Sequence, residues 1–495
     1  MLRPGWFPEY SPRDQKIFDT ILDRIRDIFE QRNFQHIRTP AVEKNEVLLK
    51  GGETVANEIF GLHSIKPIKE HIYAITQYIE TLWNIDDNKN LVIQKLLKYI
   101  TTQEFQKEDL ETLIQEKDQL IKWREYDEKL MKDKISELFW TNNNEWWLKK
   151  YSLHFDLTVP FARYTLDHLN ELVFPFKRYQ MQPVWRGERQ QRGRFREFRQ
   201  CDVDSIWKSW TSVGYRYGAE TIATLQSAIQ SVFSHYNIQK SFVSHVSHIG
   251  LTKAFLAFYL DNDDAKVKAV TDLLDKYYKK EHDVFATELQ SLVSAELAEM
   301  ILKLIETKDY SILSNYDEEA FQILDSTIIT LQKLWAKIVF DITIVRGLGY
   351  YTDIVFETFL EEEIALGSIC SGGGYEDFTK FLDPKQVYSW IGGSIGLSRL
   401  MEIILEQASS QDSIESYLFV NFEETFDAIL SLYTRFLSEW KICELYPTAA
   451  KFGKQLEYAD KKWISKVVIL GTTEQQEAVY IIKDLATGEQ QKIDI

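Results

Sequence analysis

One short segment of this acidic chain is strongly basic. Residues 177–199 read KRYQMQPVWRGERQQRGRFREFR and hold eight Arg or Lys against two Glu, a local net charge of +6 in a chain whose total is −17. Like charges at this density repel one another unless an anion offsets them. Gly187 and Gly193 allow a turn between two extended arms, so the segment predicts a hairpin that carries arginines to a phosphate group, which a guanidinium can bind through two oxygens. A solvated basic surface is the alternative.

A second candidate block is LHFDLTVPFARY, residues 153–164. Asp156 and Thr158 lie two residues apart, and on a strand this spacing points both side chains to one face. A carboxylate beside a hydroxyl suits an ammonium group. Most such pairs have no function, so the block predicts a site only in combination with others.

The third block, RQCDVDSIW (199–207), follows the basic segment directly. Gln200, Asp202 and Asp204 alternate with Cys201 and Val203, as expected for a strand with one polar face. Polar side chains on a core strand are costly to bury unless a ligand satisfies them. The alternative is a half-exposed strand whose polar face lies in water.

Glycine-rich blocks follow in the second half of the chain: RGLGYYTDIVFE (346–357), SGGGYED (371–377) and WIGGSIGLSRLMEIIL (390–405). Glycines let a backbone approach a ligand closely, and tyrosines supply walls and hydroxyl groups. The first two blocks fit a turn with core aromatics equally well. In the third, a strand leads into a helix with Arg399 near its start. This arginine could bind a phosphate at the start of the helix; the alternative is an arginine exposed to solvent.

The elements that position these blocks follow from breakers and periodicity. Residues 68–150 and 251–346 contain neither Gly nor Pro, which predicts two helical insertions. Ser11-Pro12-Arg13-Asp14 predicts the start of a first helix with an apolar stripe, and residues 34–43 predict a strand ending near Pro40. Strands are also expected at 342–347, 353–359 and 364–370. Short turns join them without helices, so we expect an antiparallel sheet.

The last part of the chain differs in pattern. Strand-like runs at 417–422, 441–447 and 466–471 alternate with helix-like stretches up to Trp440 and over 451–462. This alternation predicts a small α/β domain with a mostly parallel sheet.

Composition bounds the class of protein. The 495 residues are 44% hydrophobic and 27% charged, which predicts a multidomain soluble protein and no general nucleic-acid coat. The three cysteines have no CxxC spacing, so we expect no structural metal site and a reducing cytoplasm. The N-terminus has no apolar signal region and no run approaches 18 apolar residues, so neither secretion nor a membrane span is expected.

Taken in order, the blocks resemble the catalytic domain of class II aminoacyl-tRNA synthetases, and most closely the histidyl-tRNA synthetases. IRTPAVE around Pro40 is similar to motif 1, VWRGERQQRGRFREFRQCDVD to motif 2 and GGSIGLSRL to motif 3. RGLGYYTDIVFE and SGGGYED resemble the two histidine signatures. The C-terminal region is similar to the anticodon-binding domain of that subgroup. Residues 64–150 have no counterpart.

The resemblance implies the fold: an α+β catalytic domain on an antiparallel sheet with helical insertions, plus a C-terminal α/β anticodon-binding domain. The implied order is catalytic domain at 1–63, helical insertion at 64–150, catalytic domain at 151–245, helical insertion domain at 246–339, catalytic domain at 340–410 and anticodon-binding domain at 411–495. It also implies a cytoplasmic homodimer whose partners are L-histidine, ATP with Mg²⁺ and tRNA(His), with no protein metal site and no membrane.

Each site residue then has an implied role. Arg186 and Arg346 would be the catalytic pair, acting on the α-phosphate and the reacting oxygens. Histidine would be bound by Asp156, Leu157, Thr158, Gln200, Asp204, Tyr350, Tyr351 and Tyr375. ATP would be bound by Arg186, Glu188, Arg194, Phe198 and Arg399, and the tRNA acceptor end by Gln191 and Arg196.

The chain departs from the family pattern at three positions. Gly349 stands where an acidic residue is common, and Gly374 and Glu376 stand where the family commonly has Arg and Asp. Two other readings remain: the non-catalytic regulatory paralogue that activates ATP phosphoribosyltransferase, and a class II synthetase for threonine, proline or glycine. Arg186, Arg194, Arg399 and the C-terminal region argue against the paralogue, and the two signatures argue against another amino acid.

Overall fold

The structure is a computed structural model of the whole chain, and it describes residues 7–49, 59–61, 151–187, 195–208, 214–345, 351–375, 378–407 and 415–495. The predicted helical insertion at 64–150 lies outside these residues. Within the described ranges, no helix has both the length and the apolar character needed to cross a membrane.

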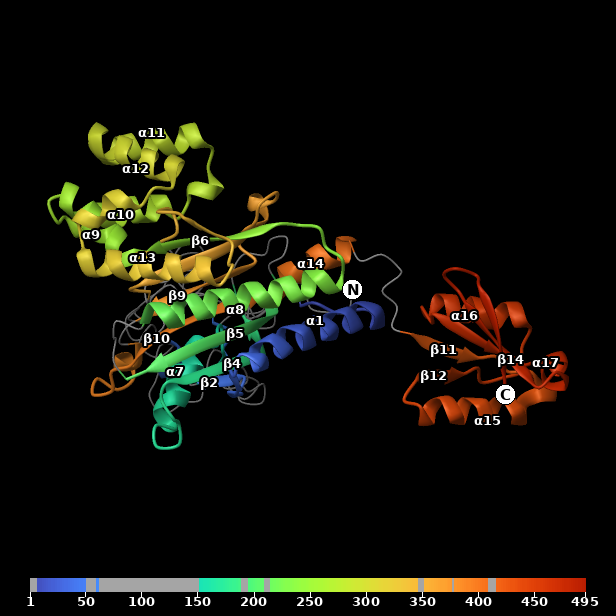
Figure 1. Cartoon of the computed structure of the whole chain (residues 1–495). Coiled ribbons are helices and arrows are strands. Elements are labelled where there is room, and N and C mark those ends of the chain that lie inside the picture. The colour runs from blue at the N-terminus through green and yellow to red at the C-terminus, as the bar shows by residue number, and fades with distance from the viewer. Residues whose placement is uncertain are drawn as a thin grey trace, which may run out of the picture.

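An eight-stranded sheet forms the centre of the larger body (Figure 1). Its spatial order is β1 (Gln35–His36), β4 (Phe176–Trp185), β5 (Glu197–Trp207), β10 (Ser389–Gly396), β9 (Cys370–Tyr375), β8 (Ile354–Leu360), β6 (Phe242–His248) and β7 (Ile338–Phe340). Among the described strands of this sheet, the parallel pairs are the two outermost ones, β1 with β4 and β6 with β7. The predicted antiparallel sheet is therefore confirmed.

Helices α1 (Pro12–Gln31), α8 (Gly214–His235) and α13 (Glu318–Lys333) lie along one face of this sheet (Figure 1). The start of α1 is as predicted, because the Ser11 hydroxyl accepts the Asp14 N–H at 3.2 Å and Pro12 occupies the first turn. Its apolar stripe packs into the same core as Cys201 and Val203 of β5. That face of β5 is therefore apolar core.

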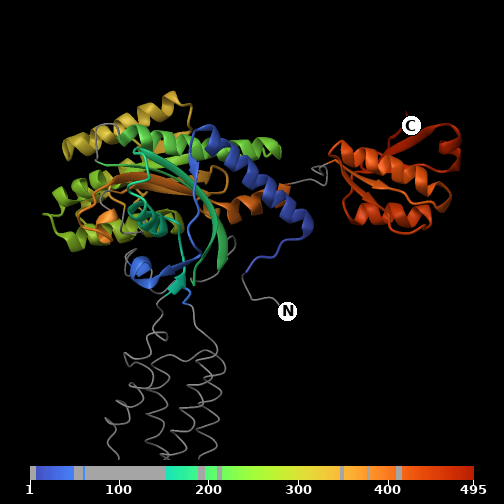
Figure 2. The same cartoon turned by 90° about the horizontal axis from the view of Figure 1, so that it is seen from below.

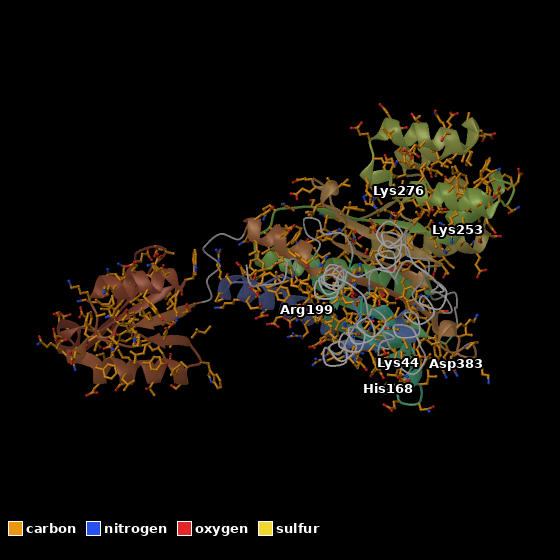
Figure 3. The ribbon with its side chains drawn as sticks, turned by 180° about the vertical axis from the view of Figure 1, so that it is seen from behind. Lys44, His168, Arg199, Lys253, Lys276 and Asp383 are labelled. Carbon is orange, nitrogen blue, oxygen red and sulfur yellow. The ribbon has the colours of Figure 1, made fainter. Side chains whose placement is uncertain are left out.

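Residues 249–333 are mainly helical, as the absence of Gly and Pro predicted. Helices α9 (Ile249–Tyr259), α10 (Asp264–Leu274), α11 (His282–Leu292) and α12 (Ala295–Thr307) precede α13 at the β6 end of the sheet (Figure 1). Asp263, Ser294 and Asp317 cap α10, α12 and α13 through their side chains. We call α9–α13 the helical segment; Lys253 and Lys276 mark it in Figure 3.

On the opposite face, a second apolar cluster centres on Trp390 and Phe161, whose rings stack 5.2 Å apart. It includes α7 (Thr158–Asp167) and the short α2 (Asn45–Leu48). A two-stranded sheet of β2 (Val42–Lys44) and β3 (Tyr151–Leu153) lies beside it. Helix α14 (Leu397–Gln407) continues directly from β10.

Three strand predictions were wrong in position. Residues 342–345 form a turn and not a strand, because the Asp341 carboxylate accepts the Thr343 N–H at 3.0 Å; the nearby strand is β7, which ends at Phe340. Residues 364–366 form a 3₁₀ turn, and Gly367 at φ +83° delays the next strand until Cys370. The predicted strand at 34–43 is divided into β1 and β2.

The C-terminal body holds a separate five-stranded sheet, drawn at the red end of the colour scale (Figures 1 and 2). Its order is β12 (Ile442–Leu445), β11 (Ser416–Phe419), β13 (Lys466–Ile469), β14 (Val479–Asp484) and β15 (Gln490–Asp494), with helices α15 (Phe426–Ser438), α16 (Phe452–Lys461) and α17 (Thr472–Gln476). The α/β alternation is confirmed. The sheet is mixed and not mostly parallel, because the short turn at Gly488 joins β14 and β15 as an antiparallel hairpin.

Candidate active site

A single large cleft collects most of the residues predicted from sequence. Its volume is about 1480 Å³. The predicted residues that line it are Asp156, Thr158, Arg186, Phe198, Gln200, Asp204, Tyr351, Tyr375 and Arg399. The motifs that carry them are spread over more than 200 residues of sequence, and the sheet brings them together.

Five predicted site residues, Glu188, Gln191, Arg194, Arg346 and Tyr350, lie outside the described residues. Arg196 is described, and its backbone oxygen accepts the Arg186 N–H at 2.9 Å, which closes the two arms of the predicted hairpin. The arms themselves pair antiparallel from Phe176 opposite Ile206 to Trp185 opposite Glu197.

The polar face of β5 forms the floor of the cleft. Gln200, Asp202 and Asp204 point into it, as their alternation predicted, and Asp204 is only 2% exposed. The half-exposed alternative is thus wrong for Asp202 and Asp204, while Gln200 is of intermediate burial. Opposite them on β10 stand three small residues, Gly396, Ser394 and Gly392.

Small residues on β10 are a steric requirement of this floor. A Cβ atom on Gly392 would lie 1.8 Å from Asp204 Oδ1, far inside any contact distance. The glycine-rich block 390–396 therefore makes room for the Asp204 side chain.

Arg178 is a buried ionic partner of the cleft carboxylates that sequence reasoning missed. It was counted only as one charge of the basic segment, yet it is fully buried on β4 directly opposite Asp204. Its Nη2 atom lies 2.6 Å from Asp204 Oδ2 and 3.8 Å from an Asp202 carboxylate oxygen, and its guanidinium lies 4.4 Å from the Phe161 ring. Cross-strand pairing was the missing information, because β4 and β5 place these charges face to face.

Several buried polar atoms of this floor have no hydrogen-bond partner among the described residues. They are Asp156 Oδ2, Gln200 Oε1, Asp202 Oδ1 and the Nε and Nη1 atoms of Arg178. Orphaned buried polar atoms are rare in folded proteins and point to a missing ligand. We call Asp156, Arg178, Gln200, Asp202 and Asp204 the floor cluster.

Burial also changes the acidity of the floor cluster. It raises the pKa of Asp156 to about 6 and that of Asp202 to about 7, and it raises the pKa of Asp204 as well, while Arg178 acts in the opposite direction on all three. Carboxyl groups with raised pKa values in a cleft are typical of functional sites. A bound cation would favour their ionised forms.

The local structure around Asp156 differs from the prediction. Asp156 lies in a loop and Thr158 begins α7, so the two do not share a strand face. Asp156 lines the cleft, its Oδ1 accepts the Val159 N–H in the first turn of α7 at 3.2 Å, and its Oδ2 has no hydrogen-bond partner among the described residues. Leu157 is fully buried, and its carbonyl oxygen lies 3.4 Å from Arg178 Nη2.

Two arginines line the cleft away from its floor. Arg186 follows β4, donates from Nε to the Phe155 carbonyl at 3.0 Å and lies 5.1 Å from the Phe198 ring. Arg399 on α14 donates to the Ser368 carbonyl and packs beside Gly367. Both side chains are therefore oriented by backbone contacts before any ligand binds.

Aromatic residues close the floor at Asp204. Tyr375 is buried and donates its hydroxyl to Asp204 Oδ1 at 3.0 Å. Its ring lies 5.5 Å from that of Tyr351 and 4.7 Å from that of Trp390. The glycines of block 371–377 belong to strand β9 and not to a turn; at Gly373 a Cβ would lie 2.6 Å from the Tyr351 ring.

Not every basic residue of the segment faces the cleft. Arg199, labelled in Figure 3, alternates with Gln200 and so lies on the other face of β5. Its guanidinium donates to the Met181 carbonyl at 3.2 Å and lies 5.7 Å from the Phe18 ring of α1. Arg199 therefore supports packing.

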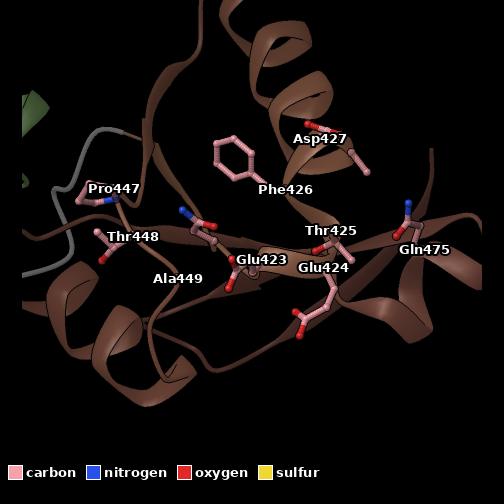
Figure 4. A pocket seen from close by; sticks show the side chains of 11 residues that line it. Glu423, Glu424, Thr425, Phe426, Asp427, Pro447, Thr448, Ala449 and Gln475 are labelled. Carbon is pink, nitrogen blue, oxygen red and sulfur yellow. The ribbon is translucent and has the colours of Figure 1, made fainter.

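The C-terminal body has a cavity of its own, about 550 Å³ in volume (Figure 4). It lies where β11 and β12 end and α15 begins, and Glu423, Glu424 and Asp427 line it. None of the site residues predicted from sequence belongs to it. In the ranges that the structure describes, no group of three or more His, Cys, Asp or Glu side chains is placed to hold a metal.

Known proteins share both parts of this architecture. The family model described as histidyl-tRNA synthetase matches residues 143–400, and that described as anticodon binding domain matches residues 417–495. The antiparallel sheet, the arginine-bearing hairpin and the C-terminal domain make the chain a class II aminoacyl-tRNA synthetase.

Individual relatives match this chain over 70% to 99% of its length. A histidine–tRNA ligase of Clostridium acetobutylicum is 29% identical over 99% of this chain and 97% of its own length. One from Cutibacterium acnes is 35% identical over 70% of this chain and 78% of its own. The crystal structure of histidyl-tRNA synthetase from Nostoc sp. PCC 7120 superposes with a TM-score of 0.71 and 25% identity, covering 99% of this chain and 96% of that one. The chain belongs to the histidyl-tRNA synthetase family.

Proposed function

We propose that this protein activates L-histidine with ATP to histidyl-adenylate and transfers the histidine to the 3′ end of tRNA(His). One observation carries the proposal: a single cleft combines a buried, partly unsatisfied acidic floor with arginines above it. An acidic floor suits a cationic amino acid, and arginines suit phosphates. Family membership supports the same reaction.

The amino acid is held at the floor cluster. Asp156 and Thr158, with the backbone at Leu157, bind the α-ammonium group, and the unpaired Asp156 Oδ2 supports this role. Gln200 and Arg346 bind the carboxylate end. Ion pairing at a buried site also keeps Asp156 ionised, against the effect of burial on its pKa.

Asp204 binds one imidazole nitrogen, and Tyr350, Tyr351 and Tyr375 enclose the ring. The hydrogen bonds from Arg178 and Tyr375 fix the Asp204 carboxylate before histidine enters. A residue of similar size without ring nitrogens would lack this hydrogen bond to Asp204, and the loss of a buried hydrogen bond favours its rejection.

Arginines and an aromatic ring hold the nucleotide. Arg186 binds the ATP α-phosphate, Phe198 stacks on the adenine, and Arg399 binds the γ-phosphate side, while Glu188 and Arg194 orient the nucleotide. A histidine carboxylate oxygen attacks the α-phosphorus, a new P–O bond forms, the bond to the β-phosphate breaks and pyrophosphate leaves. Arg186 and Arg346 stabilise charge that grows during this step.

Bound ATP would carry Mg²⁺ on its phosphates. This ion requires oxygen ligands and usually shares phosphate oxygens with one or two carboxylates. Glu402 and Glu406 lie one helical turn apart on α14 and line the cleft beside Arg399, so the donor set fits. The ion supplies neutralisation of phosphate charge.

Transfer requires tRNA at two places. A terminal ribose hydroxyl attacks the adenylate carbonyl, and AMP leaves. Gln191 and Arg196 on the hairpin contact the acceptor end, and residues 411–495 read the anticodon, an unpaired loop suited to recognition by base edges and stacking. We also propose the division into the six segments expected from sequence.

We also infer a homodimer that works in the cytoplasm. The exposed apolar side chains Val42, Leu49 and Tyr151 gather around β2 and β3, next to the segment that resembles motif 1. Light scattering coupled to size exclusion tests the dimer, and a monomer at micromolar concentration would contradict it.

ATP–pyrophosphate exchange with each of the twenty amino acids tests the proposed reaction. We expect exchange with histidine that requires Mg²⁺. Exchange with another amino acid and not with histidine, or with none, would overturn the proposal.

A further inference from the structure

A second buried ionic cluster lies outside the floor cluster. Asp341 is fully buried just after β7. Its Oδ2 lies 2.7 Å from His245 Nδ1 and 2.9 Å from Lys308 Nζ, and it accepts the Tyr278 hydroxyl. Its Oδ1 accepts the Thr343 N–H at 3.0 Å and the Thr343 hydroxyl at 2.7 Å. We call these five residues the Asp341 cluster.

The partners of Asp341 come from three different parts of the fold. His245 lies on β6, while Tyr278 and Lys308 belong to the helical segment, Lys308 as the left-handed C-cap of α12. Thr343 lies in the turn that follows Asp341. The carboxylate thus connects the sheet edge, the helical segment and this turn at one point.

The turn is part of the active-site cleft, although Asp341 itself is not. Thr343, Ile344 and Val345 line the cleft, and Tyr278 lines it from the helical segment. The next residue in the chain is Arg346. We call Thr343–Val345 the cleft wall.

Asp341 is ionised in this setting. Hydrogen bonds from His245 and Tyr278 and the charge of Lys308 hold its pKa below the usual range, against the opposing and largest single effect of burial. Removing one partner of a buried ionic group leaves the others uncompensated, so such a cluster resists rearrangement. The cleft wall is therefore firmly held to the helical segment.

We propose that Asp341 is a positioning residue for adenylation, which couples the cleft wall to the helical segment through Thr343, Tyr278 and Lys308. The inference rests on the proposed histidine activation, because the wall leads directly to Arg346. The ion pair that Lys308 of the helical segment forms with Asp341 would then affect the rate of adenylate formation, although Lys308 does not line the cleft.

Four variants divide the coupling into its parts. Asp341→Asn removes the charge, and Lys308→Met removes only the ion pair from the helical segment. Tyr278→Phe and Thr343→Val keep shape and lose a hydroxyl. The control is Lys268→Met, which breaks an exposed ion pair with Asp272 (2.9 Å) in the same segment. Thr343→Ser is the conservative rescue, because it keeps the hydroxyl.

Two readouts separate positioning from stability. In ATP–pyrophosphate exchange well below the melting temperature, we expect kcat to fall about 10- to 100-fold for Asp341→Asn, as for a misplaced catalytic geometry, and several-fold for Lys308→Met, with histidine KM changed much less. In hydrogen exchange, amides of residues 342–345 should become less protected in both. Lys268→Met should match the wild type in both readouts, and Thr343→Ser should recover most of what Thr343→Val loses.

The outcomes are distinguishable. If the wild type exchanges with histidine while Lys308→Met, Tyr278→Phe and Thr343→Val keep wild-type kcat, Asp341 has no positioning role. If protection at 342–345 is unchanged in Lys308→Met, the coupling is wrong whatever the substrate is. If protection falls in Lys308→Met while the wild type activates another amino acid, the coupling holds and the proposed function fails.

Discussion

The floor cluster and the Asp341 cluster are both buried and ionic, but they differ in completeness. Asp341 has hydrogen-bond or ionic partners at both carboxylate oxygens. In the floor cluster, Asp156, Gln200, Asp202 and Arg178 each keep at least one polar atom without a partner in the described part of the chain. Native proteins rarely bury polar atoms without hydrogen-bond partners. We therefore infer that the Asp341 cluster stabilises the fold and that the unpaired atoms of the floor cluster bind a ligand.

The pKa values of the carboxyl groups also differ between the two clusters. Charged and hydrogen-bonding partners lower the pKa of Asp341, whereas burial raises the pKa values of Asp156 and Asp202 to about 6 and about 7. A completed cluster stabilises its own charge. An incomplete cluster depends on a cationic ligand to do so, which agrees with a substrate that carries an ammonium group.

The largest expected effect is that of replacing Arg186 or Arg346, the two arginines proposed to catalyse adenylate formation. In Arg186→Ala and Arg346→Ala, ATP–pyrophosphate exchange should fall by about two or more orders of magnitude, because each removes preorganised charge that matters most in the transition state. Circular dichroism should show an intact fold. Near-normal turnover in either variant would remove that residue from the mechanism.

A smaller effect is expected at the glycine that accommodates the floor cluster. Gly392→Ala places a Cβ 1.8 Å from Asp204 Oδ1, so Asp204 must move. We expect kcat/KM for histidine to fall at least about 10-fold, with ATP KM changed less. Gly453→Ala on α16 is the matched control: a Cβ there meets nothing within 4 Å, and Ala favours the helix. Equal kinetics in the two variants would contradict the steric role of Gly392.

The pH dependence of histidine binding tests the raised pKa values of the floor-cluster carboxyl groups. Because burial raises the folded pKa values of Asp156 and Asp202 above the ordinary value of 3.8, protonation favours the empty folded state, and stability is lost as pH rises from 3.8 to about 6 and about 7. Substrate binding needs the ionised forms. Histidine KM should therefore rise several-fold from pH 8 to pH 6.

The variant Asp202→Asn separates this effect from the titration of the substrate imidazole, whose pKa is near 6.5 and which affects both proteins equally. Its KM should depend less on pH between 7 and 8 than that of the wild type. Identical profiles would show that Asp202 does not titrate in this range.

The smallest expected effect on activation is that of the C-terminal body. Deleting residues 413–495 should leave ATP–pyrophosphate exchange near the wild-type rate, because neither cluster lies there, and should raise the KM for tRNA. Binding of tRNA to the full chain should weaken with salt, as phosphate contacts require. Unchanged charging kinetics in the deletion would refute this division of labour.

Sequence predicted the parts whose signals are local. The cap at Ser11 and the alternation of Gln200, Asp202 and Asp204 both appear as expected. Asp156 lines the cleft but lies in a loop and not on a strand, because a carboxylate just before a helix and one on a strand can have the same two-residue spacing to Thr158. Glycine at 367 delays a strand that an apolar run predicted.

The ion pairs of Arg178 and Asp341 could not be predicted from the sequence for a different reason. Their partners are Asp204, across a strand pair, and Lys308, 33 residues earlier in a helical segment. Long-range pairing determines which charges meet, and a single sequence carries no direct signal for it. The same limit explains why the basic segment did not separate Arg199, which supports α1, from Arg186, which lines the cleft.

A crystal structure with a non-hydrolysable histidyl-adenylate analogue is the most direct test of whether the floor cluster binds the amino acid. The floor cluster should then be complete: polar atoms of the ligand should lie within about 3.2 Å of Asp156 Oδ2 and Asp204, and its phosphate mimic should lie beside Arg186. The Asp341 cluster should keep all its contacts. An analogue bound elsewhere, or bound in the cleft without contacting the floor cluster, would contradict the account.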